Sequence, residues 1–330
     1  MYNSTICISS YYASKLATIT VENTTLNSYP VKFYYNIQNS IIDAGPLGEV
    51  ALAYCDNITI QSINVSSIYV SKSNNIVING TTSSIASYGI YISRCKNVTT
   101  VNTTIIDCTH GIGVYSTSNI TVINSQISCK NQGISLISYD DVVTIKNNTI
   151  SNSYQGIYFG GDTDNTVVAN NTVINNKVGL YFGDYYYYVL VANNTIADNN
   201  IGILITAPCF ENTTIINNKI LNNINDGISI YGGTNIYILS NVLSVNTISL
   251  YGTHASLATI SISDDNLLNG HPIKYYFDSQ NIAITSGVWG ELIFAYCNNI
   301  TVQSIEVASI DVISSTMILI NNSVISHSTS

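Results

Sequence analysis

Acidic residues recur at a fixed place in a repeating pattern. Counted from the glycine that opens each repeat, Asp162 and Asp164 lie six and eight residues on and Asp184 lies five residues on. If equal positions of successive repeats stack, neighbouring carboxylates would lie about 5 to 10 Å apart, the range used in glycoside hydrolysis. Such a pair raises one pKa and supplies an acid and a base. The same count adds three more acids, Asp140, Asp141 and Glu211.

Three interpretations of these acids stay open. In an enzyme, the catalytic candidates are Asp162, Asp164, Asp184 and Asp140. Asp162 and Asp164 are also candidate Ca²⁺ ligands, because calcium prefers carboxylate oxygens. We favour a third interpretation, in which the acids are solvated turn residues, since aspartate is common in turns for local reasons.

Tyrosines accompany the acids. A run of four tyrosines follows Asp184 directly, and others lie in neighbouring repeats. Aromatic rings beside carboxylates and amides are typical of a sugar-binding face, although a stacked ladder that stabilises exposed strands has the same composition. The predicted binding residues are Tyr185, Tyr186, Tyr187, Tyr188, Tyr158, Tyr181 and Tyr139, with Tyr231 near them.

A short repeat must position these side chains. A glycine followed by alternating apolar residues recurs at Gly89, Gly111, Gly133, Gly156, Gly179, Gly202 and Gly227, with spacings of 22, 22, 23, 23, 23 and 25 residues. Asparagines keep step in two ladders, one of pairs (147–148, 170–171, 193–194, 217–218) and one looser (Asn152, Asn175, Asn199, Asn222). Asparagine and glycine tolerate the left-handed backbone of tight corners. Stacked coils about 4.8 Å apart would let the amides hydrogen-bond along the stack.

The period predicts the fold. Apolar residues alternate with polar ones, and β-branched residues dominate, which indicates strands and argues against helices. We therefore predict an all-β, single-stranded right-handed parallel β-helix, a solenoid with coils of about 22–25 residues and three short strands per coil.

The glycine and asparagine pattern resembles the NosD-like and pectin-lyase-like family of right-handed β-helices over roughly residues 40–325. The resemblance implies either an enzyme that acts on polysaccharides or a surface module. The family's sites do not carry over. A pectate-lyase-like site needs an arginine beside its acids, but the single arginine, Arg94, lies two coils from Asp140, and no Arg-x-Lys exists for a polygalacturonase-like site. A copper site needs clustered His or Met, yet four dispersed histidines and two methionines are present.

A longer repeat joins the two ends of the chain. Residues 30–39 match 272–281, and residues 53–63 match 295–305, at a constant offset of 242. We therefore divide the chain into a module opening (1–70), regular coils (71–249) and the opening of a second module copy (250–330). Duplication of a solenoid segment predicts growth by tandem addition.

Composition narrows the partners. A net charge of −9 with ten Lys and Arg argues against nucleic acid. No apolar run approaches twenty residues, so membrane insertion is not expected, and no signal peptide is visible. The seven cysteines form no CxxC pair, which disfavours zinc, while Cys108 and Cys129 fall one coil apart as a disulfide, stacked thiols or core residues. Few charges and 25 tyrosines suit an acidic environment.

We expect a non-enzymatic extracellular rod that attaches to a cell-surface polysaccharide or glycoprotein, without a cofactor. It would be an archaeal surface protein or an archaeal-virus tail-fibre module, as a homotrimer or tandem assembly. The alternatives are a polysaccharide depolymerase that uses the acids and a structural filament or surface-layer unit. Candidate glycosylation sites are Asn3, Asn57, Asn119, Asn170 and Asn299.

Overall fold

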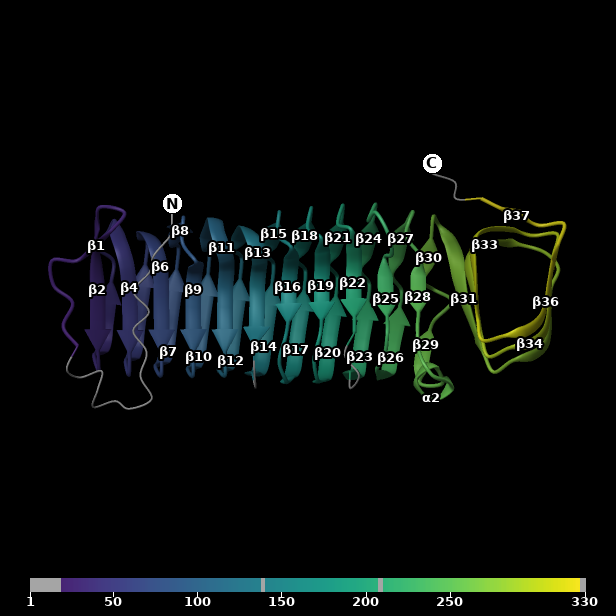
Figure 1. Ribbon diagram of the computed structural model, residues 1–330, viewed down its shortest axis with the longest axis horizontal. Helices are drawn as coiled ribbons and strands as arrows, with labels where there is room; N and C mark the ends of the chain where they lie inside the picture. Colours follow the sequence, from purple (N-terminus) through teal and green to yellow (C-terminus); the bar gives the residue numbers. More distant parts are fainter. Residues whose placement is uncertain (1–18, 138–139, 207–209, 327–330) are drawn as a thin grey trace. The chain divides into compact units, whose positions relative to one another are not determined.

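The computed structural model describes residues 19–137, 140–206 and 210–326. The chain divides into two compact units, residues 1–172 (unit 1) and 173–330 (unit 2). Nearly all described elements are short strands that stack coil upon coil, which confirms the predicted parallel β-helix (Figure 1). Two predicted site residues, Tyr139 and Asn3, lie outside the described residues.

Unit 1 contains strands of two parallel sheets. The strands of one sheet are β3 (Gln38–Ile42), β5 (Asp56–Gln61), β7 (Asn74–Asn79), β10 (Lys96–Val101), β12 (Ser118–Ile123), β14 (Asp140–Lys146) and β17 (Thr163–Ala169). The strands of the other are β1 (Thr25–Leu26), β2 (Tyr29–Tyr35), β4 (Leu47–Ala53), β6 (Asn64–Ser71), β8 (Thr82–Ser84), β9 (Tyr88–Ser93), β11 (Thr104–Tyr115), β13 (Gln126–Ile137), β15 (Thr149–Ser151) and β16 (Gln155–Phe159). The unit boundary falls within β18 (Thr172–Ile174).

Unit 2 contains two runs of coils. The regular coils comprise β19 (Val178–Phe182), β20 (Tyr186–Ala192), β21 (Thr195–Ala197), β22 (Ile201–Ile205), β23 (Phe210–Ile216), β24 (Lys219–Leu221), β25 (Ile228–Ile230), β26 (Thr234–Leu239), β27 (Val242–Ser244) and β28 (Ile248–Leu250). The segment predicted as the second opening comprises a short helix α2 (His254–Leu257), β29 (Ile260–Ile262), β30 (Leu267–Leu268), β31 (His271–Phe277), β32 (Gln280–Ile284), β33 (Val288–Ala295), β34 (Asn298–Gln303), β35 (Glu306–Ile313), β36 (Thr316–Asn321) and β37 (Val324–Ile325).

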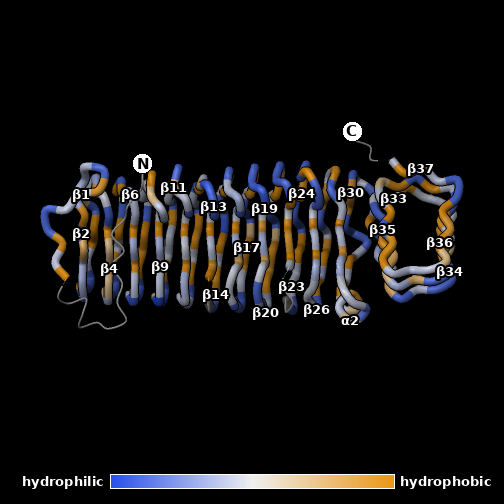
Figure 2. The backbone as a smooth tube through the Cα atoms, viewed as in Figure 1, coloured by the Kyte–Doolittle hydropathy of each residue, from blue (hydrophilic) through white to orange (hydrophobic). Residues whose placement is uncertain are grey.

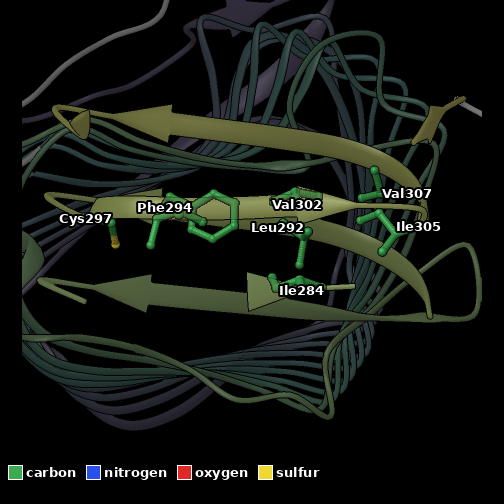
Figure 3. Close-up of a cluster of buried hydrophobic side chains, with 8 residues drawn as sticks. Ile284, Leu292, Phe294, Cys297, Val302, Ile305 and Val307 are labelled. Carbon is green, nitrogen blue, oxygen red and sulfur yellow. The ribbon is translucent and has the colours of Figure 1, made fainter. Parts of the chain in front are cut away.

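Apolar side chains fill the bore of each unit in register. Ile76 on β7 pairs with Ile58 on one side and Val98 on the other, and each is at most 1% exposed. In the second opening, Leu292 and Phe294 point into the same interior as Val302 and Ile284 (Figure 3). Along the tube, hydrophobic stretches alternate with hydrophilic ones, and blue segments mark corners of the coils around β34 and β36 (Figure 2). Alternation on a strand therefore gives a dry interior and a polar exterior.

Asparagine corners connect the strands. In the paired ladder, the first asparagine has a left-handed backbone, as at Asn193 (φ 56°) and Asn217 (φ 56°), and the second is buried. Buried Asn218 accepts a hydrogen bond from the main-chain N–H of Asn194 at 2.9 Å and donates to the carbonyl of Val191 at 2.9 Å. The predicted amide ladder is thus present, and it satisfies buried main-chain groups at the corners.

The looser asparagine ladder changes position within the coil at one of its four residues, Asn199. Asn152, Asn175 and Asn222 have left-handed φ values of 58°, 56° and 52°, as expected for corner residues. In the coil between Asn175 and Asn222, Asp198 has the left-handed backbone instead. Asn199 is buried and its carbonyl oxygen accepts a hydrogen bond from the N–H of Asn176 at 2.9 Å. In this coil the corner is Asp198, and Asn199, one residue later, occupies the buried position.

The two openings have the same internal pairing, each in its own unit. The antiparallel pair Leu26–Tyr29 recurs as Leu268–His271, at the offset of 242. In the first opening (β1–β6), successive partners are Val31, Glu49 and Ser67, which lie 18 residues apart. The opening coils are therefore shorter than the 22–25 residues predicted, and each contributes two strands, such as β4 and β5, where three were predicted. The glycine spacing could not reveal this, because it begins at Gly89.

Cys108 on β11 and Cys129 on β13 are strand partners and are 0% and 3% exposed. Both are free thiols in the interior, which fits the stacked-thiol and the core-residue alternatives. The hydrogen bond between them lowers the pKa of Cys108 and, together with burial, raises the pKa of Cys129.

Candidate functional site

The predicted acids of unit 1 lie close together. Asp141 on β14 and Asp164 on β17 are direct strand partners, and Asp162 precedes β17. Burial raises the pKa of Asp164, and the negative charges of Asp141 and Asp162 raise it further. The main chain of Asp140 pairs with Thr163. Three of the acids selected by counting from the repeat glycines, Asp141, Asp162 and Asp164, are therefore neighbours in this unit.

The calcium alternative lacks a ligand set in the structure. Within residues 19–137, 140–206 and 210–326, no three His, Cys, Asp or Glu side chains are arranged to hold a metal ion. Asp162 and Asp164 are both partly exposed, and a pair of carboxylates alone falls short of the six to eight oxygens that calcium takes.

The remaining predicted acids lie in unit 2. The carboxylate of Asp184 accepts a hydrogen bond from the N–H of Tyr185 at 3.1 Å, as is usual for a turn aspartate. Glu211 on β23 is the strand partner of Tyr187 on β20. The turn line predicted from Asp140 to Asp184 is thus divided between the units.

Exposed tyrosines cluster at one corner of unit 2. Tyr185, Tyr187 and Tyr188 are 44%, 39% and 62% exposed, and we call these three residues the tyrosine turn. The main chain of Tyr186 pairs with Phe210 on β23. These three side chains are therefore accessible from solvent.

The other two described tyrosines of the prediction are less available. In unit 2, Tyr181 on β19 is partly buried, and its hydroxyl accepts a hydrogen bond from Thr206 Oγ1 at 3.2 Å. In unit 1, the ring of Tyr158 folds over Gly160, where an added Cβ would lie 2.3 Å from the ring. These two rings are held against their own coils.

The described glycosylation candidates all lie at exposed corners. Asn57, Asn119 and Asn299 have left-handed φ values of 53°, 56° and 57°, and each carboxamide donates to the asparagine one coil earlier at 2.7, 2.8 and 2.7 Å. Asn170 is also exposed, with φ 58°. Their position on the surface is compatible with glycans, and their modification stays a prediction.

A second group of polar residues in unit 2 escaped the sequence count. Asp226, Glu291 and Asp311 interact electrostatically, and Tyr231 stacks on Tyr251. One signal was present in the sequence. Asp311 stands 242 residues after a tyrosine of the first opening, within an otherwise closely matched segment.

The coil geometry defines the class of protein, a right-handed parallel β-helix, and solved structures agree. The periplasmic alginate epimerase AlgG has a TM-score of 0.51 at 12% identity, with 82% of this chain and 76% of that chain covered. A Family 28 exopolygalacturonase of Yersinia enterocolitica has a TM-score of 0.50 at 14% identity, with 66% of this chain and 46% of that chain covered. A tailspike protein of E. coli bacteriophage HK620 has a TM-score of 0.49 at 12% identity, over 83% of this chain and 67% of that chain. No curated protein matches the sequence.

A match between the sequence and a protein-family model identifies the family. The family model described as periplasmic copper-binding protein (NosD) matches residues 20–208, which is more than half of the chain. The chain therefore belongs to the NosD family. The described part of the chain contains no helix of the length and hydropathy needed to cross a bilayer.

The copper named in the family description does not fit the described residues. His110 stacks on Tyr88 at 4.5 Å, and its ring bonds to Asn131 at 2.9 Å. His254 lies in unit 2 within 3.9 Å of Asp278, and Met317 is exposed. Copper sites in proteins gather imidazole, thiolate or thioether ligands around one point, and no group of three His, Cys, Asp or Glu side chains does so among the residues that the structure covers.

Proposed function

We propose that this NosD-family β-helix is a non-enzymatic extracellular attachment module that recognises glycans of a cell surface, as part of a virus fibre or of a surface protein. The observation that carries the proposal is the tyrosine turn, in which Tyr185, Tyr187 and Tyr188 expose their rings at one corner of unit 2. Support also comes from the fold, which the chain shares with a polysaccharide epimerase and an exopolygalacturonase.

The chemistry of the tyrosine turn suits a sugar chain. Phenol rings offer flat apolar faces for the C–H faces of sugars and a hydroxyl at the edge for hydrogen bonds. Asp184 and Glu211 lie beside the rings in sequence or strand register and supply acceptors for sugar hydroxyls. A turn on a stacked scaffold also holds its side chains on rigid strands, which lowers the entropy lost on binding.

A glycan array with the full chain tests this proposal. Tyr185→Ala with Tyr187→Ala should weaken binding to a captured glycan by tenfold or more, because two stacking surfaces are lost. Tyr237→Ala is the matched control, since Tyr237 lies in the same unit on β26 and is 43% exposed. An array without bound glycans, or equal binding by both variants, would contradict the proposal.

The depolymerase alternative has one observation in its favour, the raised pKa of Asp164 beside Asp141 and Asp162. A raised pKa makes a carboxyl better suited to act as a general acid. Asp164→Asn should then abolish cleavage of the bound polysaccharide, whereas attachment without cleavage predicts no change in product formation. Reducing-end assays on captured glycans distinguish the two functions.

The filament alternative predicts self-assembly without a glycan. Light scattering and electron microscopy of the purified chain would show filaments or sheets in that case, and discrete monomers or trimers for an attachment module. If the Tyr185→Ala, Tyr187→Ala variant forms filaments or sheets as readily as the parent chain, the structural role is favoured.

A further inference from the structure

A small pocket of unit 2 lies between the last regular coil and the second opening. Its volume is about 190 Å³, and its lining consists of Ser249, Leu250, Tyr251, Asp311, Val312 and Ile313. These residues come from the end of β28 and from β35. Pockets for drug-sized ligands have roughly 300–1,000 Å³, so this one suits a single small ring.

An aromatic stack leads into the pocket. Tyr231 and Tyr251 lie on consecutive coils, where the N–H of Tyr251 donates to the carbonyl of Ile230 at 2.7 Å. Their rings are stacked with centroids 4.3 Å apart and an interplanar angle of 8°. Tyr251 lines the pocket and is 47% exposed. A flat ligand against Tyr251 would continue the stack by one ring.

Polar groups surround the aromatic stack. The carboxylate of Asp226 accepts a hydrogen bond from Ser249 Oγ at 2.9 Å and another from Ser229 Oγ. Ser249 in turn lines the pocket beside Asp311. Hydroxyl and carboxyl groups at one side of an aromatic ring are the partners that sugar hydroxyls need.

A buried carboxyl with an unused oxygen lies on the same sheet face as Asp311. Glu291 on β33 is the strand partner of Ser309, and Asp311 follows Ser309 by two residues, so all three side chains lie on one face. Glu291 is 0% exposed, and its Oε1 has no hydrogen-bond partner. Its Oε2 accepts from the N–H of Ile248, at the start of β28, which places this face against the pocket.

We propose that the pocket binds one sugar ring without negative charge, stacked on Tyr251 and hydrogen-bonded to Asp311 and Ser249. Three carboxyl groups gather here, and the lining contains no Lys or Arg. An acidic sugar would face like charges in a partly buried place, which costs more than it would in water. Neutral sugars meet acceptors and an aromatic face without that penalty.

The first opening provides an internal comparison. The residue equivalent to Asp311 is Tyr69, whose ring lies 5.4 Å from the ring of Tyr91 in unit 1. An aromatic ring thus stands where the second opening has a short acid. Asp311→Tyr should fill the pocket with a residue that the same strand accommodates in the first opening.

Saturation-transfer NMR with the full chain tests this site. The probes are the methyl glycosides of glucose, galactose and mannose, with methyl glucuronide as the acidic probe, each at millimolar concentration and pH 7. At least one neutral glycoside should show transfer, and the signal should fall by fivefold or more for Tyr251→Ala and for Asp311→Tyr. Methyl glucuronide should show none.

The controls separate this site from the tyrosine turn. Tyr237→Ala should leave the signal unchanged, since its side chain lies elsewhere in unit 2, and the Tyr185→Ala, Tyr187→Ala pair reports the share of the signal that comes from the tyrosine turn. If no neutral glycoside shows transfer, if the glucuronide binds as well, or if both pocket variants bind like the parent chain, the proposal is wrong. Loss of signal only in the tyrosine-turn variants would also overturn it, while leaving the attachment function in place.

Discussion

The buried carboxylate of Glu291 accepts a hydrogen bond from the main-chain N–H of Ile248 at 3.0 Å, across 43 residues of sequence. Ile248 begins β28, whose strand partner β25 lies on the side of the preceding coil. Glu291 therefore satisfies a donor at the end of the regular coils with a side chain from the second opening. Asp311 and Asp226 lie near Glu291, and their negative charges raise its pKa.

Unit 2 should be more stable in acid because Glu291 is buried. Burial is the main cause that raises the pKa of Glu291; the hydrogen bond from Ile248 lowers this pKa, and the charges of Asp311 and Asp226 raise it further. The pKa of Asp311 is raised by burial and by Asp226. A folded-state pKa above the unfolded value means that the contribution is fully present below the unfolded pKa and is lost as pH rises through the folded pKa.

Glu291→Gln should flatten this pH dependence, because an amide keeps an acceptor for Ile248 and does not titrate. Thermal melts between about pH 4 and pH 8 would measure the difference from the parent chain. Glu306→Gln is the control, since Glu306 is exposed on β35. A parent midpoint that rises with pH relative to Glu291→Gln would refute the prediction.

Removing one rung of the buried asparagine ladder should destabilise unit 2. Asn218→Ala deletes the acceptor for the N–H of Asn194 and the donor to Val191. Leaving such buried groups unsatisfied costs about 1–3 kcal/mol each. Denaturant titration should show a lower midpoint. Asn217→Gly next to it, at a left-handed and exposed corner, should change the midpoint little.

A methyl group at the strand glycines should not fit. A Cβ at Gly202 would lie 2.5 Å from the carbonyl oxygen of Gly227 in the next coil. Since this neighbour is main chain, the coils must separate locally, and Gly202→Ala should lower the thermal midpoint. Ser244→Ala, a partly exposed strand position of the same unit, is the comparison. Equal midpoints for the two variants would count against close coil packing at this glycine.

The thiols of Cys108 and Cys129 should resist labelling in the folded chain. Both are buried in the interior of unit 1, and a reagent must reach the sulfur before it can react. Mass spectrometry after brief exposure to a maleimide should find these two cysteines unmodified, and modified once denaturant is present. A cross-link between them in the purified chain would show that the stacked thiols had been oxidised to a disulfide.

Local spacing predicted the strands well. The glycines at 156 and 179 stand at the second position of β16 and β19, as the alternation after each glycine indicated. The antiparallel pairs Leu26–Tyr29 and Leu268–His271 lie at the offset of 242 that the sequence shows from residue 30 on. A constant period or offset in the sequence predicts which residues occupy equivalent positions in stacked coils, because each repeat folds in the same way.

Contacts between different runs of coils could not be predicted in this way. Asp226, Tyr251 and Asp311 come together because the second opening packs against the end of the regular coils, and no period relates their positions. The shorter opening coils were missed for a related reason. The recurring strand glycine begins only at Gly89, so it could not mark these coils, whose corners include Asn57, Ser62 and Lys72.

The hydrogen bond to Ile248 also bears on aggregation. A strand at the end of a stack presents unpaired main-chain groups, and such an edge can template addition of strands from other molecules. Covering β28 with an element that carries a buried acid removes one of these donors from reach. The second opening thus covers one main-chain donor at the end of the regular coils, while its own strands carry the pairing onward from β31 through β33 to β35.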